Sequence, residues 1–184
     1  MFKRDTGQRS LVDINSLIRT VLAILRVDLQ KNGIEIETRL DERIPAIEGD
    51  MVQLQQVILN IVMNASEAMQ SVQPRRLKVQ SEQSRSGTIR VLVQDTGTGI
   101  DAANIARIFD ALFTTKSGGM GMGLSICRSI IEAHGGRIWV SPAPFEARSF
   151  NLNYRQRSAK RGSVRAPLRV NRDETGASER LFRE

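Results

Sequence analysis

The chain has 184 residues and a net charge of +7, and its single cysteine excludes an intramolecular disulfide and fits a reducing compartment. No apolar run approaches the roughly 18–20 residues of a membrane span, and the charged N-terminus offers no signal peptide. These features predict one cytoplasmic domain. Residues 155–184 hold nine basic and four acidic residues, so they carry +5 of the charge. We therefore predict a basic, disordered tail and a folded core that does not bind nucleic acid.

The first part of the chain predicts two long helices separated by extended segments. Asp13 is a candidate N-cap residue for a helix that ends near residue 32. The alternation of apolar and polar residues over 34–40 predicts a half-buried strand. Asp50 can cap a second helix over about 51–71, because apolar residues recur there at helical spacing.

The second part predicts a hairpin, a third helix and two more strands. The hairpin strands are expected at 77–80 and 88–94, and the helix at 123–134. The final strands are expected at 137–141 and 150–154. Cys127 lies among apolar helix positions, which favours core packing over reactivity. His134 ends the helix, where a cationic side chain suits the dipole, so we expect a structural role for it. The predicted organisation is a linker over 1–10, one domain over 11–154 and the tail over 155–184.

Two glycine clusters frame the segment from Asp95 to Ser125. The first, Asp95-Thr96-Gly97-Thr98-Gly99, follows an apolar strand, and the second, at 118–123, precedes a helix. Glycine lets the backbone approach a ligand closely, and a helix N-terminus favours an anion. Tight turns around a surface loop are the plainer alternative. Because both clusters occur with an acid before the first and a lysine between them, the pattern favours a nucleotide phosphate site.

Asn60 and Asn64 are four residues apart and share an otherwise apolar helix face. An unpaired buried amide costs about 1–3 kcal/mol, so each needs a partner. Hydrogen bonds in helix packing would satisfy them, and so would a hard cation that also binds phosphates. Beside the glycine clusters we favour the cation.

Asp95 is either a turn residue or an acceptor for the exocyclic amine of a base. Lys116 is either solvated or a point-charge partner for phosphate. The sequence lacks a Walker-type P-loop, the third glycine of a dinucleotide fingerprint and the protein-kinase signatures.

The order of these motifs strongly resembles the catalytic, ATP-binding domain of bacterial sensor histidine kinases. That family belongs to the superfamily of gyrase B, an ATP-dependent heat-shock chaperone and MutL, and the chain is most similar to its PAS-linked, FixL-like branch. Four ordered segments carry the resemblance, which spans roughly residues 11–141. They are an N box at 60–65, a first glycine box at 95–100, an F box at 108–116 and a second glycine box at 119–125. The fold implied is α/β, a two-layer sandwich in which helices cover one face of a mixed sheet (the Bergerat ATP-binding fold).

The resemblance implies ATP and Mg²⁺ as cofactors and assigns roles to single residues. Asn64 would ligate the metal, Asn60 would support the metal and the phosphates, and Lys116 would complete the catalytic group. Asp95 would bind the adenine amine. The further nucleotide contacts implied are Ala68, Gly97, Gly99, Ile100, Thr115, Gly119, Gly121, Gly123 and Leu124. The segment between Gly99 and Gly121 would be the ATP lid, a mobile gating element.

Three departures from the family pattern carry expectations of their own. The phosphoacceptor histidine and its dimerising hairpin are absent, so we expect an isolated catalytic domain, a fragment or a truncated gene product, that is monomeric. The F box has Ala111-Leu112 where the family usually has Pro-Phe. Residues 142–148 replace a glycine-rich turn into the last strand.

The function expected from the resemblance is transfer of the ATP γ-phosphoryl group to a histidine outside this chain, with a phosphoacceptor domain and a response regulator as partners. A non-catalytic ATP-binding module that sequesters a kinase or a response regulator remains the alternative. ATP hydrolysis is disfavoured because Asn60 stands where the gyrase branch carries a glutamate base.

Overall fold

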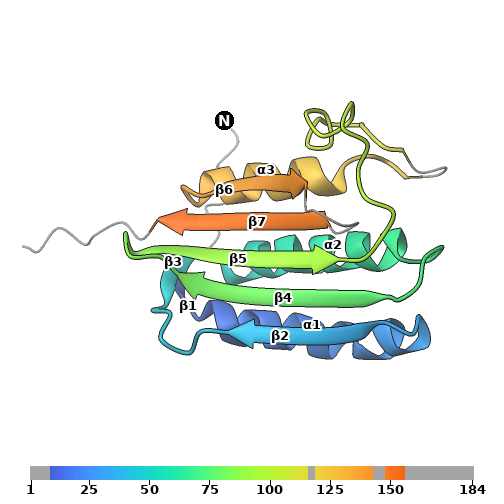
Figure 1. Ribbon diagram of the computed structural model, residues 1–184. Coiled ribbons are helices and arrows are strands. Elements are labelled where there is room, and N and C mark those ends of the chain that lie inside the picture. The colour runs from blue at the N-terminus through green and yellow to red at the C-terminus, as the bar shows by residue number, and fades with distance from the viewer. Residues whose placement is uncertain (1–8, 116–118, 143–147, 156–184) are drawn as a thin grey trace, which may run out of the picture.

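A layer of helices lies behind a five-stranded sheet in the computed structural model, which describes residues 9–115, 119–142 and 148–155 (Figure 1). The helices are α1 (Ile14–Lys31), α2 (Met51–Ala68) and α3 (Gly123–Ala133). The strands are β1 (Ser10–Val12), β2 (Glu35–Leu40), β3 (Ile47–Gly49), β4 (Arg76–Gln83), β5 (Thr88–Asp95), β6 (Arg137–Pro142) and β7 (Arg148–Arg155).

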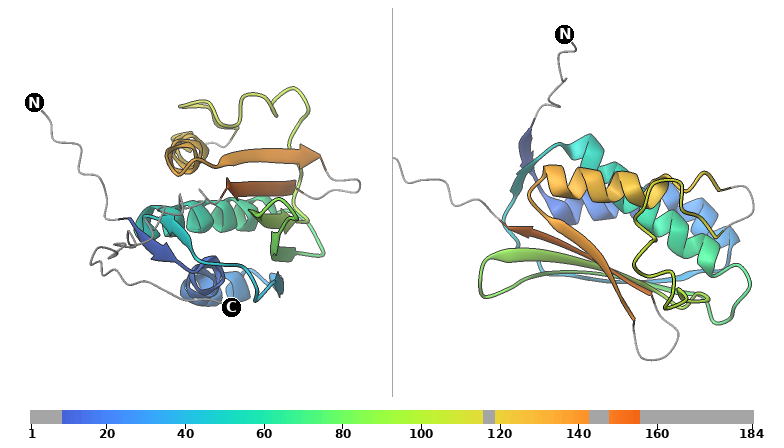
Figure 2. Two further views of the ribbon diagram at one scale, coloured as in Figure 1. Left: turned by 90° about the vertical axis from the view of Figure 1, so that its left-hand side faces the viewer. Right: turned by 90° about the horizontal axis from the view of Figure 1, so that it is seen from above.

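The large sheet has the strand order β2-β4-β5-β7-β6. Only β2 and β4 pair in parallel, with α2 in the connection between them, and the other neighbours are antiparallel. Strands β1 and β3 form a separate antiparallel pair from which α1 and α2 both start. All three helices cover the same face of the sheet (Figure 2), which confirms the predicted two-layer α/β sandwich.

Both predicted aspartate caps are confirmed. The Asp13 carboxylate accepts from the backbone N–H groups of Asn15 and Ser16, at 2.9 and 3.2 Å. The Asp50 carboxylate accepts in the same way at the start of α2, at 2.9 and 3.1 Å. Each cap satisfies donors that have no partner within the first turn of a helix. Helix α2 ends at Ala68, three residues before the predicted end at 71, and continues as turns.

The expectation of a half-buried strand over 34–40 is wrong for most of its residues. Ile34 is buried, but it precedes β2, and Ile36 is 38% exposed. Every residue of β2 before Leu40 is exposed. β2 forms one edge of the sheet, and none of its residues belongs to the buried core.

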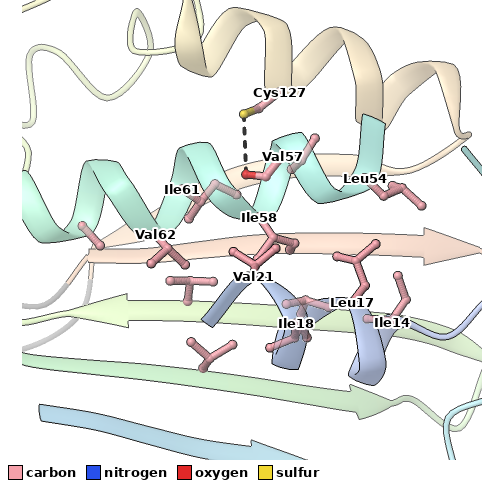
Figure 3. Close-up of a cluster of buried hydrophobic side chains, with 14 of the residues drawn as sticks. Ile14, Leu17, Ile18, Val21, Leu54, Val57, Ile58, Ile61, Val62 and Cys127 are labelled. Carbon is pink, nitrogen blue, oxygen red and sulfur yellow. Dashed lines mark hydrogen bonds between the residues drawn. The ribbon is translucent and has the colours of Figure 1, made fainter. Parts of the chain in front are cut away.

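The core lies between α1, α2 and the inner face of the sheet (Figure 3). Its fully buried members include Ile18 and Val21 of α1 and Val57 and Ile61 of α2. Burying such a side chain contributes roughly 1.5–3 kcal/mol relative to exposing it. Cys127 is also fully buried, as predicted, and its S–H donates to the Val57 carbonyl at 3.9 Å.

His134 has the structural role predicted for it, but a different interaction explains its position. Its Nε2 accepts from the backbone N–H of Asp50 at 2.9 Å, and its Nδ1 lies 2.8 Å from the Ile130 carbonyl. Nε2 therefore accepts and Nδ1 donates, so both ring nitrogens are used in hydrogen bonds to the backbone. A hydrogen-bonded link from the end of α3 to the start of α2 therefore accounts for the position of His134.

None of the helices in the described part of the chain is long and apolar enough to span a membrane. The predicted linker lies outside the described residues as far as residue 8, and the predicted tail from 156 onward also lies outside them.

Candidate nucleotide-binding site

A cavity of about 1090 Å³ opens where α2 ends and α3 begins. Its walls come from the last turn of α2, the segment after β5, residues 113–115 and the start of α3. Ligand pockets typically measure about 300–1,000 Å³, so a nucleotide fits in this volume.

Most of the predicted site residues meet in this cavity. Those that line it are Asn64, Ala68, Gly99, Ile100, Thr115, Gly119, Gly121, Gly123 and Leu124. Asn60, Asp95 and Gly97 are not among the lining residues, and Lys116 is outside the described residues. Segments some sixty residues apart in the sequence are thus brought together around one space.

The two asparagines of α2 have different surroundings. Asn64 lies at the cavity wall, and a Cβ atom built on Gly123 would stand 4.0 Å from its Nδ2. Asn60, one turn earlier, donates from Nδ2 to the Cys127 sulfur at 3.7 Å. Thus Asn64 faces the cavity beside the start of α3, whereas Asn60 bonds across the contact between α2 and α3.

Asp95, the last residue of β5, is completely buried, and its Oδ1 accepts from the Gly97 N–H at 2.8 Å. A Cβ atom on Gly97 would come within 2.7 Å of both the Cβ and the carbonyl oxygen of Ala68. The Thr98 N–H donates to the same carbonyl at 3.2 Å. The chain after β5 is therefore fixed closely against the last turn of α2, with a carboxylate beneath the cavity wall.

The start of α3 forms part of the cavity wall. Met122 is the N-cap residue and makes no side-chain capping bond, and Gly123 lines the cavity. The N-terminus of an α-helix carries a partial positive charge and unpaired donors, so it suits phosphate oxygens.

The expected lid segment folds back on itself. Gly121 has φ +66°, and a Cβ atom there would lie 2.5 Å from the Leu112 carbonyl carbon, so only glycine fits. Leu112 also has a positive φ, +65°, and is 73% exposed. The Arg107 guanidinium stacks over the Phe113 ring at 4.7 Å. The departure noted in the F box thus coincides with an unusual backbone conformation.

Arg75 is a residue that sequence reasoning missed. Its guanidinium donates to the carbonyl oxygens of Asn32, Gln70 and Val72, at 2.7, 2.6 and 3.2 Å. It thereby ties the end of α1 to the turns after α2, and Gln70 lines the cavity. The available signal was an arginine shortly after a helix C-terminus, where carbonyls lack partners.

Comparison with known proteins assigns this arrangement to a family. Residues 49–167 match the family described as histidine kinase-, DNA gyrase B-, and HSP90-like ATPase. The chain belongs to this ATPase family. It is 38% identical over 136 residues to the sensor histidine kinase TmoS of Ectopseudomonas mendocina. It is 39% identical over 136 residues to the sensor protein FixL of Bradyrhizobium diazoefficiens. These matches cover 72% and 74% of the chain but 14% and 27% of the relatives, so the chain spans less than a third of their length.

Solved structures of ATPases of this family show the same fold. The catalytic domain of the histidine kinase ThkA has a TM-score of 0.73 and 33% identity, with 81% of this chain and 96% of that domain covered. Full-length ShkA in complex with AMPPNP also has a TM-score of 0.73, at 28% identity, with 83% of this chain and 32% of ShkA covered. The predicted fold and the predicted resemblance to histidine kinase catalytic domains are therefore confirmed.

Proposed function

We propose that the chain is the ATP-binding catalytic domain of a two-component sensor histidine kinase and that it transfers the γ-phosphoryl group to a histidine outside this chain. The observation that carries the proposal is the cavity in which Asn64 and the N-terminus of α3 meet. The AMPPNP complex of ShkA, a structural neighbour, supports a nucleotide as the ligand.

The acceptor must lie elsewhere because His134 is the chain's single histidine and is only 6% exposed. Both of its ring nitrogens lie within hydrogen-bond distance of backbone groups, the Asp50 N–H and the Ile130 carbonyl. In the proposed reaction an imidazole nitrogen of the acceptor bonds to the γ-phosphorus. The bond from that phosphorus to the bridging oxygen breaks, ADP leaves with the bonding electron pair, and the N–H proton of the imidazole passes to water.

Each part of the cavity has a task in this proposal. The N–H groups at the start of α3 bind phosphate oxygens, and the Asn64 amide oxygen binds the metal. Mg²⁺ fits here because it prefers oxygen ligands and takes few from protein when phosphates supply the others. When bound, it would neutralise phosphate charge. Asp95 accepts from the adenine amine, and Lys116 pairs with the phosphates.

Partners and location follow from the same proposal. Four apolar side chains on residues in or near the cavity wall are exposed, and exposed apolar side chains fit contact with a docking phosphoacceptor domain. They are Leu112, Met120, Met122 and Ile126. A response regulator is the second partner, in line with the structure of ThkA in complex with the response regulator TrrA. Because ATP and response regulators are cytoplasmic, we place the domain in the cytoplasm.

A non-catalytic ATP-binding module is the second candidate, and the backbone at Leu112 favours it. A leucine at φ +65° is uncommon, and it stands in the segment expected to close over ATP. If this conformation prevents closure, ATP binds without phosphoryl transfer.

The test mixes the chain with a separately purified FixL phosphoacceptor domain and γ-labelled ATP, and measures label on the acceptor. We expect labelling, with loss of at least about tenfold in Mg·ATP affinity in Asn64→Ala, equivalent to about 1.4 kcal/mol. Gln56→Ala, which removes an exposed amide from the same helix, should leave the acceptor labelling and the Mg·ATP affinity unchanged. Binding without labelling would support the second candidate, and failure to bind Mg·ATP would reject both.

A further inference from the structure

The contact between α2 and α3 contains a small chain of polar groups centred on the Cys127 sulfur. The amide nitrogen of Asn60 donates to this sulfur at 3.7 Å, and the thiol donates to the Val57 carbonyl at 3.9 Å. Figure 3 shows the thiol pointing at that carbonyl across the two helices. The thiol therefore serves as acceptor and donor at once.

Cys127 suits this role because it is inert. The side chain is fully buried, and burial raises its pKa to about 11. At neutral pH the sulfur therefore keeps its proton and can donate it in the hydrogen bond to the Val57 carbonyl. The sulfur lone pairs then remain for the Asn60 amide.

The orientation of Asn60 follows from this contact. An asparagine side chain carries a donor and an acceptor at the two ends of one planar amide. Fixing the nitrogen against the sulfur also fixes the direction of the oxygen. Asn60 is half-buried and lies one turn before Asn64, which lines the cavity.

We propose that Cys127 is a positioning residue that holds the Asn60 amide so that its oxygen serves the metal and phosphate side of the cavity. This inference rests on the proposed function, since it gives Asn60 a part in binding Mg·ATP. It gives Cys127 of α3 a role in orienting the Asn60 side chain of α2. A helix that starts at the phosphates thereby also orients an asparagine on its neighbour.

The test measures how much Mg²⁺ strengthens ATP binding, by calorimetry with ATP in excess Mg²⁺ and with ATP in EDTA. We expect Cys127→Ala to reduce the strengthening by about 3- to 10-fold, the loss of one hydrogen bond, and to leave the metal-free affinity unchanged. Cys127→Ser keeps a donor and an acceptor, so it should retain most of the strengthening. Cys127→Val fills the volume without the acceptor and should behave as Cys127→Ala does.

Two comparisons separate positioning from a packing role. In an Asn60→Ala background, Cys127→Ala should cause no further loss, because the amide it orients is gone. Ile130→Val, which trims another buried side chain of α3, should lower the melting temperature without changing the Mg²⁺ effect. The inference would be overturned if the losses of the Mg²⁺ effect in Asn60→Ala and Cys127→Ala added up in the double variant. It would also be overturned if Cys127→Ala and Cys127→Val left the Mg²⁺ effect unchanged. Neither result would affect the proposed function. Absence of Mg·ATP binding by the unsubstituted chain would overturn the proposed function together with this inference.

Discussion

Gly97→Ala is expected to disturb stability and nucleotide binding together. A Cβ atom at this position would lie 2.7 Å from the Ala68 Cβ, from the Ala68 carbonyl oxygen and from Asp95 Oδ1. Two of these atoms belong to the last turn of α2, and the third is a buried carboxylate, so none can move aside cheaply. Overpacking of this kind costs about 1–3 kcal/mol. The chain after β5 must then separate from α2, and Ile100 and Asp95 lose their positions relative to Ala68.

Thermal unfolding followed by circular dichroism and Mg·ATP calorimetry measure the two effects. Each kcal/mol lost lowers the thermal unfolding midpoint by roughly 2–4 °C, so the midpoint of Gly97→Ala should fall measurably. Its affinity for Mg·ATP should fall at least about tenfold. Gly33→Ala is the matched control, because Gly33 has φ +63° at the end of α1 and has no atom near its Cβ position. It should lower stability and leave affinity intact. If Gly97→Ala kept the wild-type midpoint and affinity, the close packing on Ala68 would be refuted.

Three other substitutions or treatments test single contacts. Asp13→Ala should cost about 1 kcal/mol at neutral pH. Hydrogen bonds from Ser16 lower the pKa of Asp13 below its ordinary 3.8, so urea titrations should show the cost disappearing as pH falls through that lowered pKa. Cys127 should resist iodoacetamide at pH 8, since burial raises its pKa to about 11, and should react once urea unfolds the chain. His134→Ala should lower the free energy of unfolding by about 1–3 kcal/mol, because the Asp50 N–H loses its acceptor, and an unchanged urea midpoint would contradict this.

The elements that sequence predicted well are those whose signals are local. Asp13 and Asp50 indicate where α1 and α2 start, because an N-cap side chain accepts from N–H groups only two or three residues along the chain. The hairpin of β4 and β5 follows from two alternating runs around a turn at 84–87. By contrast, the parallel pairing of β2 with β4 and the place of β7 between β5 and β6 depend on contacts between distant segments. No local pattern records which alternating strand lies outside the core, so the exposure of Ile36 was missed.

The same distinction between local and distant signals applies to the candidate site. The glycine clusters and Asn64 were predicted because glycine and a helical amide pair are visible in short stretches. The hydrogen bonds of Arg75 were missed, since its acceptors come from the ends of two helices that meet only in the folded chain. The partner of Asn60 was missed for the same reason, because Cys127 lies 67 residues away.

The antiparallel pair of α2 and α3 explains why so few residues can define the cavity. At one end the His134 ring accepts from Asp50, the N-cap residue of α2, and near the middle Cys127 accepts from Asn60. At the other end Gly123 stands beside Asn64. These contacts at three levels fix how far one helix can slide along the other, because each joins a residue of α2 or its cap to a residue of α3 or its cap. The spacing between the Asn64 amide and the N–H groups at the start of α3 is therefore set by the whole length of the helix pair, and packing far from the cavity decides whether a phosphate fits there.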